Sequence, residues 1–256
     1  MTKHTSIAVL LCAAVLSACG TKVAQDITGP LPSARVKFFN FGVNAPGVNF
    51  YANTAKMTAV SSTTGTESVT GVVYGGVGAG GFYTGIAPGQ YTLSGNIAAA
   101  TDKDLAVSKV TATIADGKSY SFYMSGFYDA TAKTVEGFVL EDAYPAAIDY
   151  AQTYVRFVNA ISNSQPMILY AKNQTTAAEV AVGAAVAYKG AGVFTPLPGA
   201  VYDLSARLAG SATNLFTRTG VSFSAGRVYT VGARGDITIT STTATNRPSF
   251  DNTANR

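Results

Sequence analysis

The sequence predicts an all-β protein that contains two tandem β-sandwich domains. Three observations favour this fold class: short segments in which apolar and polar residues alternate, turn-forming residues between those segments, and an internal repeat. Alternation with a period of two is typical of strands that bury one face. No segment has the periodicity of an amphipathic helix, and "IAAATDKDLAV" could hold one helical turn at most.

Residues 1–18 are expected to form a lipoprotein signal peptide. A short polar start that carries Lys3 precedes the apolar run Ile7–Leu16. This order is typical of a secretory signal, and the run is too short to span a hydrocarbon core, which takes about 20 apolar residues. The stretch Leu16-Ser17-Ala18-Cys19 resembles a bacterial lipobox. The resemblance implies cleavage before Cys19 and a lipid on its thiol.

A lipid on Cys19 implies attachment to a membrane of the bacterial cell envelope. Two or more fatty-acyl chains, such as palmitate, anchor a protein stably, whereas one chain binds marginally. Gly20 stands where enteric bacteria use Asp to retain a lipoprotein at the inner membrane, so the outer membrane is the expected location. Whether the chain faces the periplasm or the cell surface stays open. Residues 19–33 are expected to be a flexible tether.

The composition of the chain after the signal excludes several classes of enzyme. Residues 19–256 contain no histidine, and Cys19 is their single cysteine. A Ser-His-Asp triad, a Cys-His pair and the usual zinc sites are therefore excluded. We expect no catalytic residue, cofactor or metal site, although carboxylate, Tyr, Lys and Ser-Lys chemistry stays open. The net charge is +4 without a run of Lys or Arg, so nucleic acid is not an expected partner.

An internal repeat divides most of the remaining chain into two copies. The stretch "VKFFNFGVNAPGVNFYAN" recurs as "VRFVNAISNSQPMILYAKN", which matches Lys37 with Arg156. Further on, "IAPGQYTLS" recurs as "LPGAVYDLS", and "ADGKSYSFY" recurs as "SAGRVYTVG". Three blocks in the same order predict two homologous domains, residues 34–143 and 152–240, each near the common size of a domain.

Each copy is predicted to contain six to eight short strands. In "RVKFFN", Val36 and Phe38 are expected to face the core and Lys37 the solvent. Turn signals such as Pro88-Gly89 and Asp116-Gly117 separate the strands. Many short strands in about 100 residues favour an immunoglobulin-like or transthyretin-like sandwich.

The segments outside the two copies are expected to be solvated. Residues 144–151 form a short linker with Pro145, next to the acidic residues Glu141 and Asp142. Residues 241–256, rich in Thr and Asn, are expected to be a disordered tail.

The order of motifs resembles a bacterial family, the domain of unknown function 4397. Residues from Ala34 carry the pattern as "ARVKFFNFGVNAPGVNFYAN", "APGQYTLS" and "DGKSYSFYMSG". The second copy keeps "YVRFVNA", "LPGAVY" and "AGRVYTVGARG" but has "SQPMILY" in place of the "APxV" element. The resemblance implies an exported or anchored protein, with no settled activity and no catalytic residues to transfer.

Aromatic residues supply the candidate contact surface. The stretch "SYSFYMSGFYD" contains Tyr120, Tyr123, Phe127 and Tyr128. Alternate rings in a strand face opposite sides, and an exposed Tyr offers contact area at a small entropy cost. Core packing with a few exposed rings is the favoured role of this stretch, and contact with an envelope polysaccharide or a protein is the alternative. The second copy, at +4 against −1 for the first, also suits an anionic polysaccharide.

Other motifs are weaker candidates. The G-x-G-x-x-G match in "GGVGAGG" is not followed by a helical pattern, as dinucleotide binding requires. Asp102 and Asp104 are too few for a calcium loop. Glu141 and Asp142 are neighbours in a strand, so they cannot flank one glycosidic bond.

The sequence therefore favours a non-catalytic binding or structural module of the cell envelope. Two alternatives stay open: a glycan-acting envelope enzyme that uses carboxylates or a Tyr, and an accessory subunit of an export or adhesin system.

Overall fold

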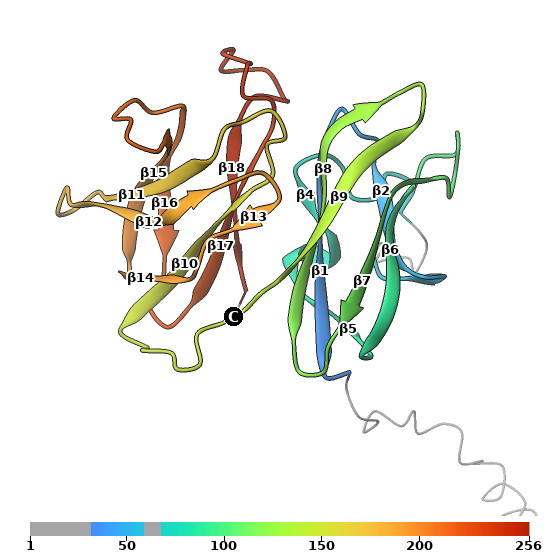
Figure 1. Ribbon diagram of the computed structural model, residues 1–256, viewed down its shortest axis with the longest axis horizontal. Helices are drawn as coiled ribbons and strands as arrows, with labels where there is room; N and C mark the ends of the chain where they lie inside the picture. The colour runs from blue at the N-terminus through green and yellow to red at the C-terminus, as the bar shows by residue number, and fades with distance from the viewer. Residues whose placement is uncertain (1–31, 59–67, 256) are drawn as a thin grey trace, which may run out of the picture. The chain divides into compact units, whose positions relative to one another are not determined.

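The computed structural model describes residues 32–58 and 68–255, which form two β-sandwiches (Figure 1). The prediction of an all-β, sandwich-like fold is confirmed. We call strands β1–β9 sandwich 1 and strands β10–β18 sandwich 2.

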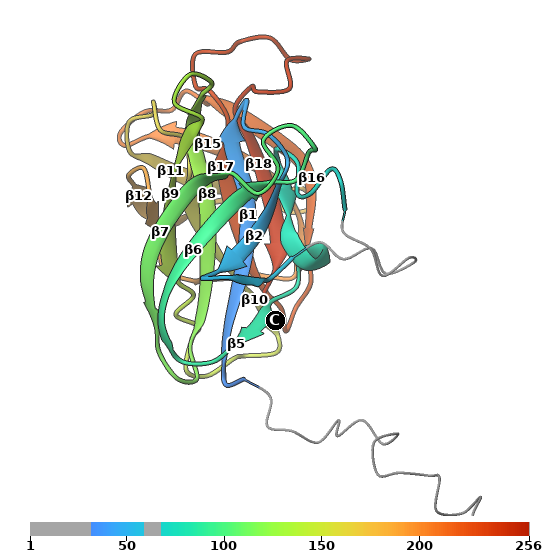
Figure 2. The same ribbon diagram turned by 90° about the vertical axis from the view of Figure 1, so that its right-hand side faces the viewer.

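Sandwich 1 consists of two sheets that pack face to face (Figure 2). One sheet has the order β4-β1-β8-β9, with β5 also paired to β1, and the other has the order β3-β2-β6-β7. The bounds are β1 (Ala34–Val43), β2 (Val48–Ala52), β3 (Ala55–Lys56), β4 (Gly76–Val77), the 3-10 helix η1 (Gly78–Gly81), β5 (Thr84–Ile86), β6 (Gly89–Ile97), β7 (Ala106–Ile114), β8 (Ser119–Asp129) and β9 (Thr134–Glu141).

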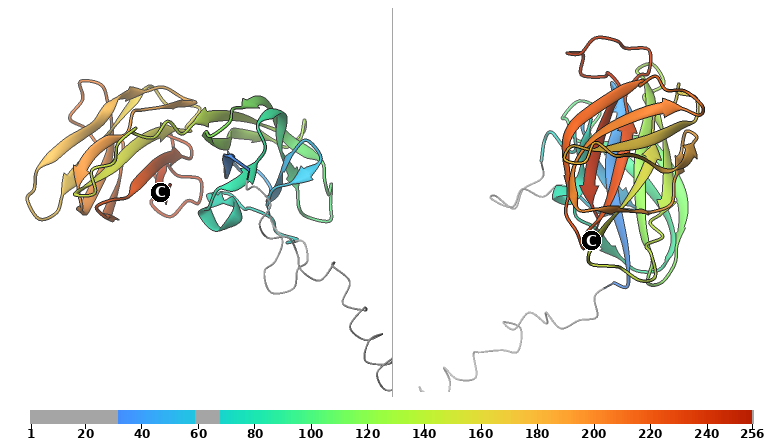
Figure 3. Two further views of the ribbon diagram at one scale, coloured as in Figure 1. Left: turned by 90° about the horizontal axis from the view of Figure 1, so that it is seen from below. Right: turned by 90° about the vertical axis from the view of Figure 1, so that its left-hand side faces the viewer.

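Sandwich 2 also consists of two sheets (Figure 3). One has the order β13-β10-β17-β18, with β14 also paired to β10, and the other has the order β12-β11-β15-β16. The bounds are β10 (Gln152–Asn159), β11 (Met167–Asn173), β12 (Glu179–Val186), β13 (Gly190–Ala191), β14 (Thr195–Pro198), β15 (Ala200–Leu208), β16 (Phe216–Phe223), β17 (Val228–Arg234) and β18 (Ser249–Ala254).

The two sandwiches have the same topology, strand for strand. Each strand of sandwich 1 corresponds to the strand numbered nine higher in sandwich 2. The parallel pairing of β1 with β8, the one such pairing among the described strands of sandwich 1, recurs as β10 with β17. The turns before β8 and β17 both carry a glycine at positive φ, Gly117 at 68° and Gly226 at 75°, a conformation that favours glycine. Corresponding residues can therefore be assigned from strand register.

Each sandwich has an apolar core between its sheets. The core of sandwich 1 includes Phe38, Phe50 and Phe122, and that of sandwich 2 includes Phe157 and Phe223. The rings of Phe38 and Phe50 stack with centroids 5.2 Å apart. Aromatic side chains bury 150–250 Å² each, so the Phe-rich strands account for much of the apolar burial.

The other face of β1 is also buried, which corrects one expectation. Phe39, Phe41 and Tyr123 form a third apolar cluster with Val158 and Ala160 of sandwich 2. The Tyr123 ring stacks on Phe39, with centroids 4.4 Å apart. The strand pattern predicted a solvent-facing side for β1, but the second sandwich covers it. Lys37, expected in solvent, is fully buried for the same reason.

The C-terminal segment corrects a second expectation. Residues 249–254, predicted to lie in a disordered tail, form β18 and pair with β17 over six residues. β18 corresponds to β9, so it completes the sheet that the repeat requires. Phe250 is 1% exposed and packs on Phe216, with centroids 4.5 Å apart. The polar composition of the segment concealed the strand, because one buried ring supplies most of its apolar contact.

Candidate functional site: a buried ionic cluster and an apolar pocket

The buried charged side chains of the described residues lie in one cluster. They are Lys37 on β1, Arg156 on β10 and Asp142, which directly follows β9. Asn255, which directly follows β18, is buried beside them and accepts a hydrogen bond from Lys37. We call these four residues the ionic cluster.

The Arg156 half of the ionic cluster is a salt bridge. The Nη2 group of Arg156 contacts Oδ1 of Asp142. Nη1 of Arg156 donates to the backbone oxygen of Glu141 at 3.2 Å, and its Nε donates to Oγ1 of Thr230 at 3.0 Å. Oδ2 of Asp142 accepts from the hydroxyl of Ser121 at 2.8 Å. A buried ion pair needs such additional hydrogen bonds to offset the desolvation of its charges.

Two tyrosines close the Asp142 side. The hydroxyl of Tyr83 donates to Oδ2 of Asp142 and lies 2.5 Å from the hydroxyl of Tyr144. Burial and the neighbouring charge of Asp142 raise the pKa of Tyr83 far above its usual value. Burial is also the main reason that the pKa of Tyr144 rises to about 12. Both phenols therefore stay protonated at neutral pH and act as hydrogen-bond donors.

Within residues 32–58 and 68–255, no carboxylate is in direct contact with the amine of Lys37. Nζ of Lys37 donates to the backbone oxygen of Ala254 at 2.8 Å and to Oδ1 of Asn255 at 3.0 Å. It also lies 4.5 Å from the centroid of the Tyr83 ring. Desolvation lowers the pKa of Lys37 to about 8, although Asp142 acts in the opposite direction. A large fraction of this amine is therefore neutral in mildly alkaline solution.

Sequence reasoning missed the ionic cluster. Lys37 was assigned to solvent, and Glu141 and Asp142 to a solvated linker. Glu141 does pair with Lys118 at a partly exposed site, but Asp142 is 2% exposed. The match of Lys37 with Arg156 in the repeat was the available signal, because a cation at the same strand position in both copies suggests a shared role.

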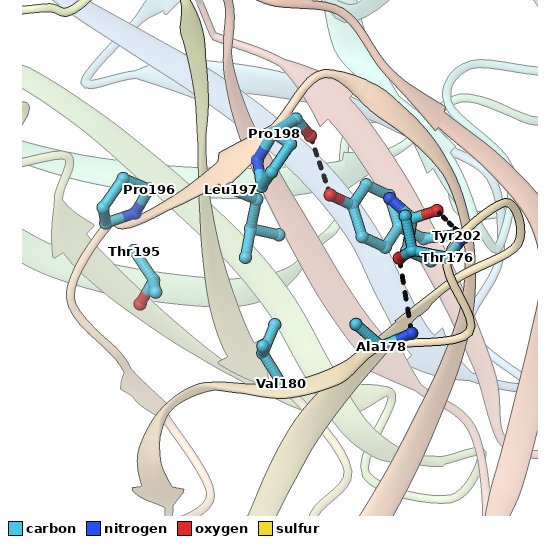
Figure 4. A pocket seen from close by; sticks show the side chains of 9 residues that line it. Thr176, Ala178, Val180, Thr195, Pro196, Leu197, Pro198 and Tyr202 are labelled. Atoms are coloured by element: carbon cyan, nitrogen blue, oxygen red, sulfur yellow. Dashed lines mark hydrogen bonds between the residues drawn. The ribbon is translucent and has the colours of Figure 1, made fainter.

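An apolar pocket lies at one edge of sandwich 2, between the turn before β12, the strands β12 and β14, and β15 (Figure 4). Its volume is about 410 Å³, within the range of small-molecule sites. Tyr202 forms one wall, and its hydroxyl donates to the backbone oxygen of Pro198 at 2.7 Å. The lining residues are Asn173, Thr176, Ala178, Val180, Thr195, Pro196, Leu197, Pro198 and Tyr202.

The pocket suits an apolar group better than a sugar. Val180, Pro196 and Leu197 face it, and it contains no charged side chain. β12 is the edge strand of its sheet, and edge strands can pair with an added strand of another chain. The sequence offered no sign of this pocket, because its residues come from four separate strands and a turn.

The predicted contact rings are only partly exposed. Tyr120 is 8% exposed in the core of sandwich 1, and Tyr123 is fully buried in the third cluster. Neither ring can contact a partner at the surface, which corrects those two predictions. Phe127 is 44% exposed and Tyr128 is half-buried. Tyr120 faces the core of sandwich 1, and sandwich 2 covers the opposite face of β8, where Tyr123 lies.

The residues of the weaker motifs make contacts with neighbouring side chains or form short local structure. Asp102 pairs with Lys133 at 2.7 Å, and Asp104 accepts a hydrogen bond from Tyr51. The glycine-rich stretch forms the short η1, which is followed by the extended residue Phe82.

Cys19, the predicted lipidation site, lies outside the described residues. The described part of the chain contains no helix with the length and hydropathy that a membrane crossing requires.

A family model described as "Domain of unknown function (DUF4397)" matches residues 34–170. The matched range covers sandwich 1, the connection, β10 and the start of β11. A search of curated proteins found no match.

Proposed function

Since the chain belongs to the DUF4397 family, whose description assigns no activity, we propose a function from the chain's own residues: it is a lipid-anchored, non-catalytic binding module of the bacterial cell envelope. The apolar pocket of sandwich 2 receives an apolar side chain of an extended segment of a partner protein. The observation that carries the proposal is this pocket of about 410 Å³, which has no charged lining residue and lies beside the edge strand β12.

The ionisable groups support a non-catalytic role. Carboxylates that could serve a glycan-acting enzyme are held in ion pairs, such as Asp142 with Arg156 and Glu179 with Arg207. Asp251 likewise pairs with Arg234. These pairs are distributed over both sandwiches, whereas glycoside hydrolysis needs two carboxyl groups on either side of one bond.

We also propose that sandwich 2 is a second copy of the family domain. The strand order, the parallel pairing and the glycine turns recur. The repeated sequence blocks support the same conclusion.

The lipid anchor is tested by substitution of Cys19. Cys19→Ala is expected to move most of the protein from the membrane fraction to the soluble fraction, because the acyl chains supply the membrane affinity. Fractionation of cell lysates by ultracentrifugation and blotting would measure this. Cys12→Ala, in the apolar run before the proposed cleavage position, is the control and should leave the protein in the membrane. Membrane retention of Cys19→Ala would contradict the anchor.

The pocket is tested by photo-crosslinking in living cells. Benzoylphenylalanine in place of Thr176, an exposed lining residue, is expected to form a protein adduct of discrete mass. The additional substitution Val180→Asp should abolish the adduct, because a charge in an apolar pocket opposes an apolar ligand. Benzoylphenylalanine in place of Val193, which is 74% exposed outside the pocket, is the control. No adduct, or equal adducts at both positions, would exclude the protein-binding role.

A further inference from the structure

Lys37 and Asn255 bring an amine and a carboxamide together in a buried site. Nζ of Lys37 lies 3.0 Å from Oδ1 of Asn255, and the two residues are 218 positions apart in the sequence. Lys37 is fully buried and Asn255 is 9% exposed. Nδ2 of Asn255 donates to Oγ1 of Thr230 at 2.5 Å, which fixes the orientation of the amide.

The strand register shows that Asn255 of sandwich 2 has a counterpart in sandwich 1. Tyr120 pairs with Glu141 and Tyr229 pairs with Ala254, so the next residues, Asp142 and Asn255, correspond. The backbone N–H groups of these two residues make matching hydrogen bonds, to Ser119 and Val228, both at 2.7 Å.

The counterparts bond reciprocally across the two sandwiches. Lys37 of sandwich 1 bonds to Ala254, the last residue of β18, and to Asn255, which follows it. Arg156 of sandwich 2 bonds to Glu141 and Asp142 of sandwich 1. In each half, a basic residue of one sandwich bonds to the end of the last strand of the other sandwich. One half pairs Arg with Asp, and the other half pairs Lys with Asn.

Asn255 stands where the other half of the cluster has Asp142, so the charges of the ionic cluster do not balance. Its members include two cations, Lys37 and Arg156, and one carboxylate, Asp142, which is bonded to Arg156. A buried ammonium that is bonded only to neutral oxygens carries a desolvation cost that a carboxylate would offset. The cost disappears if the nitrogen of Lys37 becomes part of a neutral amide.

We propose that Lys37 and Asn255 are joined by an intramolecular isopeptide bond. The lone pair of the neutral Nζ attacks Cγ of Asn255 and forms a C–N bond. The bond between Cγ and Nδ2 then breaks, and Nδ2 leaves as ammonia with a proton that Nζ gives up. The product is a secondary amide, and no oxidant, metal or cofactor is consumed.

The surroundings favour this step. Nζ must be unprotonated to attack, and desolvation lowers its pKa to about 8. Oδ1 of Asn255 already lies within hydrogen-bond distance of Nζ, and such proximity replaces a bimolecular encounter. The Arg156 half cannot react in this way, because guanidinium stays protonated and Asp142 offers no amide.

The bond would tie the first strand to the end of the last. Lys37 lies in β1 and Asn255 directly follows β18, so nearly the whole described chain lies inside the closed loop. A cross-link that closes a long loop restricts the unfolded chain more than a short one does. The chain after the predicted signal has a single cysteine, Cys19, so this amide would serve where a disulfide cannot form.

Peptide mapping of the purified full-length protein tests the proposal. Trypsin cannot cleave after an acylated Lys37, so the digest is expected to contain residues 36–56 joined to residues 235–256. The joined mass should be about 17 Da below the sum of the two peptides, which is the mass of the ammonia lost. Recovery of residues 38–56 and 235–256 as free peptides, without the joined species, would overturn the proposal.

Two variants identify the bonded pair. Lys37→Arg keeps the cation and copies the Arg156 half, and Asn255→Ala removes the carboxamide. Both variants are expected to give the two peptides in free form. Each variant protein should have the full mass calculated from its sequence, without the loss of ammonia. A joined species that survives either substitution would show that other residues form the bond, which also overturns the proposal. Lys37→Arg should in addition lower the melting temperature measured by calorimetry, since the loop is no longer closed.

Discussion

Arg156→Met is expected to lower the free energy of unfolding by about 3–5 kcal/mol, because it leaves the buried carboxylate of Asp142 without its cation. Asp142 is 2% exposed and keeps the hydroxyl donors of Ser121 and Tyr83, which carry no charge to balance the carboxylate. The methionine fills much of the arginine volume, so the loss reports the charge more than a cavity. Urea denaturation of both proteins, followed by circular dichroism, measures the difference.

Two controls separate this effect from a general loss of packing. The double variant with Arg156→Met and Asp142→Leu should recover much of the loss, since a buried ion pair can often be replaced by apolar residues. Lys118→Met breaks the pair with Glu141, whose side chains are 53% and 39% exposed, and should cost at most about 1 kcal/mol. A loss for Arg156→Met no larger than that for Lys118→Met would mean that the ionic cluster does not stabilise the fold.

Phe250→Ala is expected to be nearly as damaging, with a loss of about 3–5 kcal/mol. Phe250 is 1% exposed, and its ring packs on Phe216 and Phe157. Truncation leaves a cavity beneath β18 and weakens its pairing with β17. Thermal or urea unfolding measures the loss, and hydrogen exchange should show faster exchange at the β17 amides that pair with β18.

Phe82→Ala is the matched control, because it is the same substitution at a ring that is 76% exposed. It should change the free energy of unfolding by less than about 0.5 kcal/mol. Equal effects of the two substitutions would support a disordered tail and contradict the strand. The pair of variants therefore tests the largest difference between the sequence-based expectation and the structure.

Burial on two faces explains why the site could not be read from the strands. The alternation of β1 correctly assigned Val36 and Phe38 to the core of sandwich 1. It also assigned Lys37 to the opposite face of the strand, and that assignment holds. The error was to equate the opposite face with solvent, because the pattern of one strand does not indicate what packs on its second face.

A second reason explains why neither the pocket nor the ionic cluster could be predicted from the strand patterns. Each is assembled from residues that are distant in the chain: Lys37 meets Asn255, and Thr176 faces Pro196 and Tyr202. Local spacing carries no information on such contacts unless a repeat supplies it. Here the repeat matched Lys37 with Arg156, and this correspondence was the one sequence signal that led toward the ionic cluster.

The all-β class and the family were within reach of the sequence, because strand alternation, turn residues and the motif order are local properties that any fold must respect. The contacts between segments were not, because they depend on how the sheets pack. Lys37, which the strand pattern places in solvent, is buried where the two sandwiches meet. The polar C-terminal segment forms the strand that completes a sheet. In both cases the residues that cover the segment lie far away in the chain, and no local pattern records them.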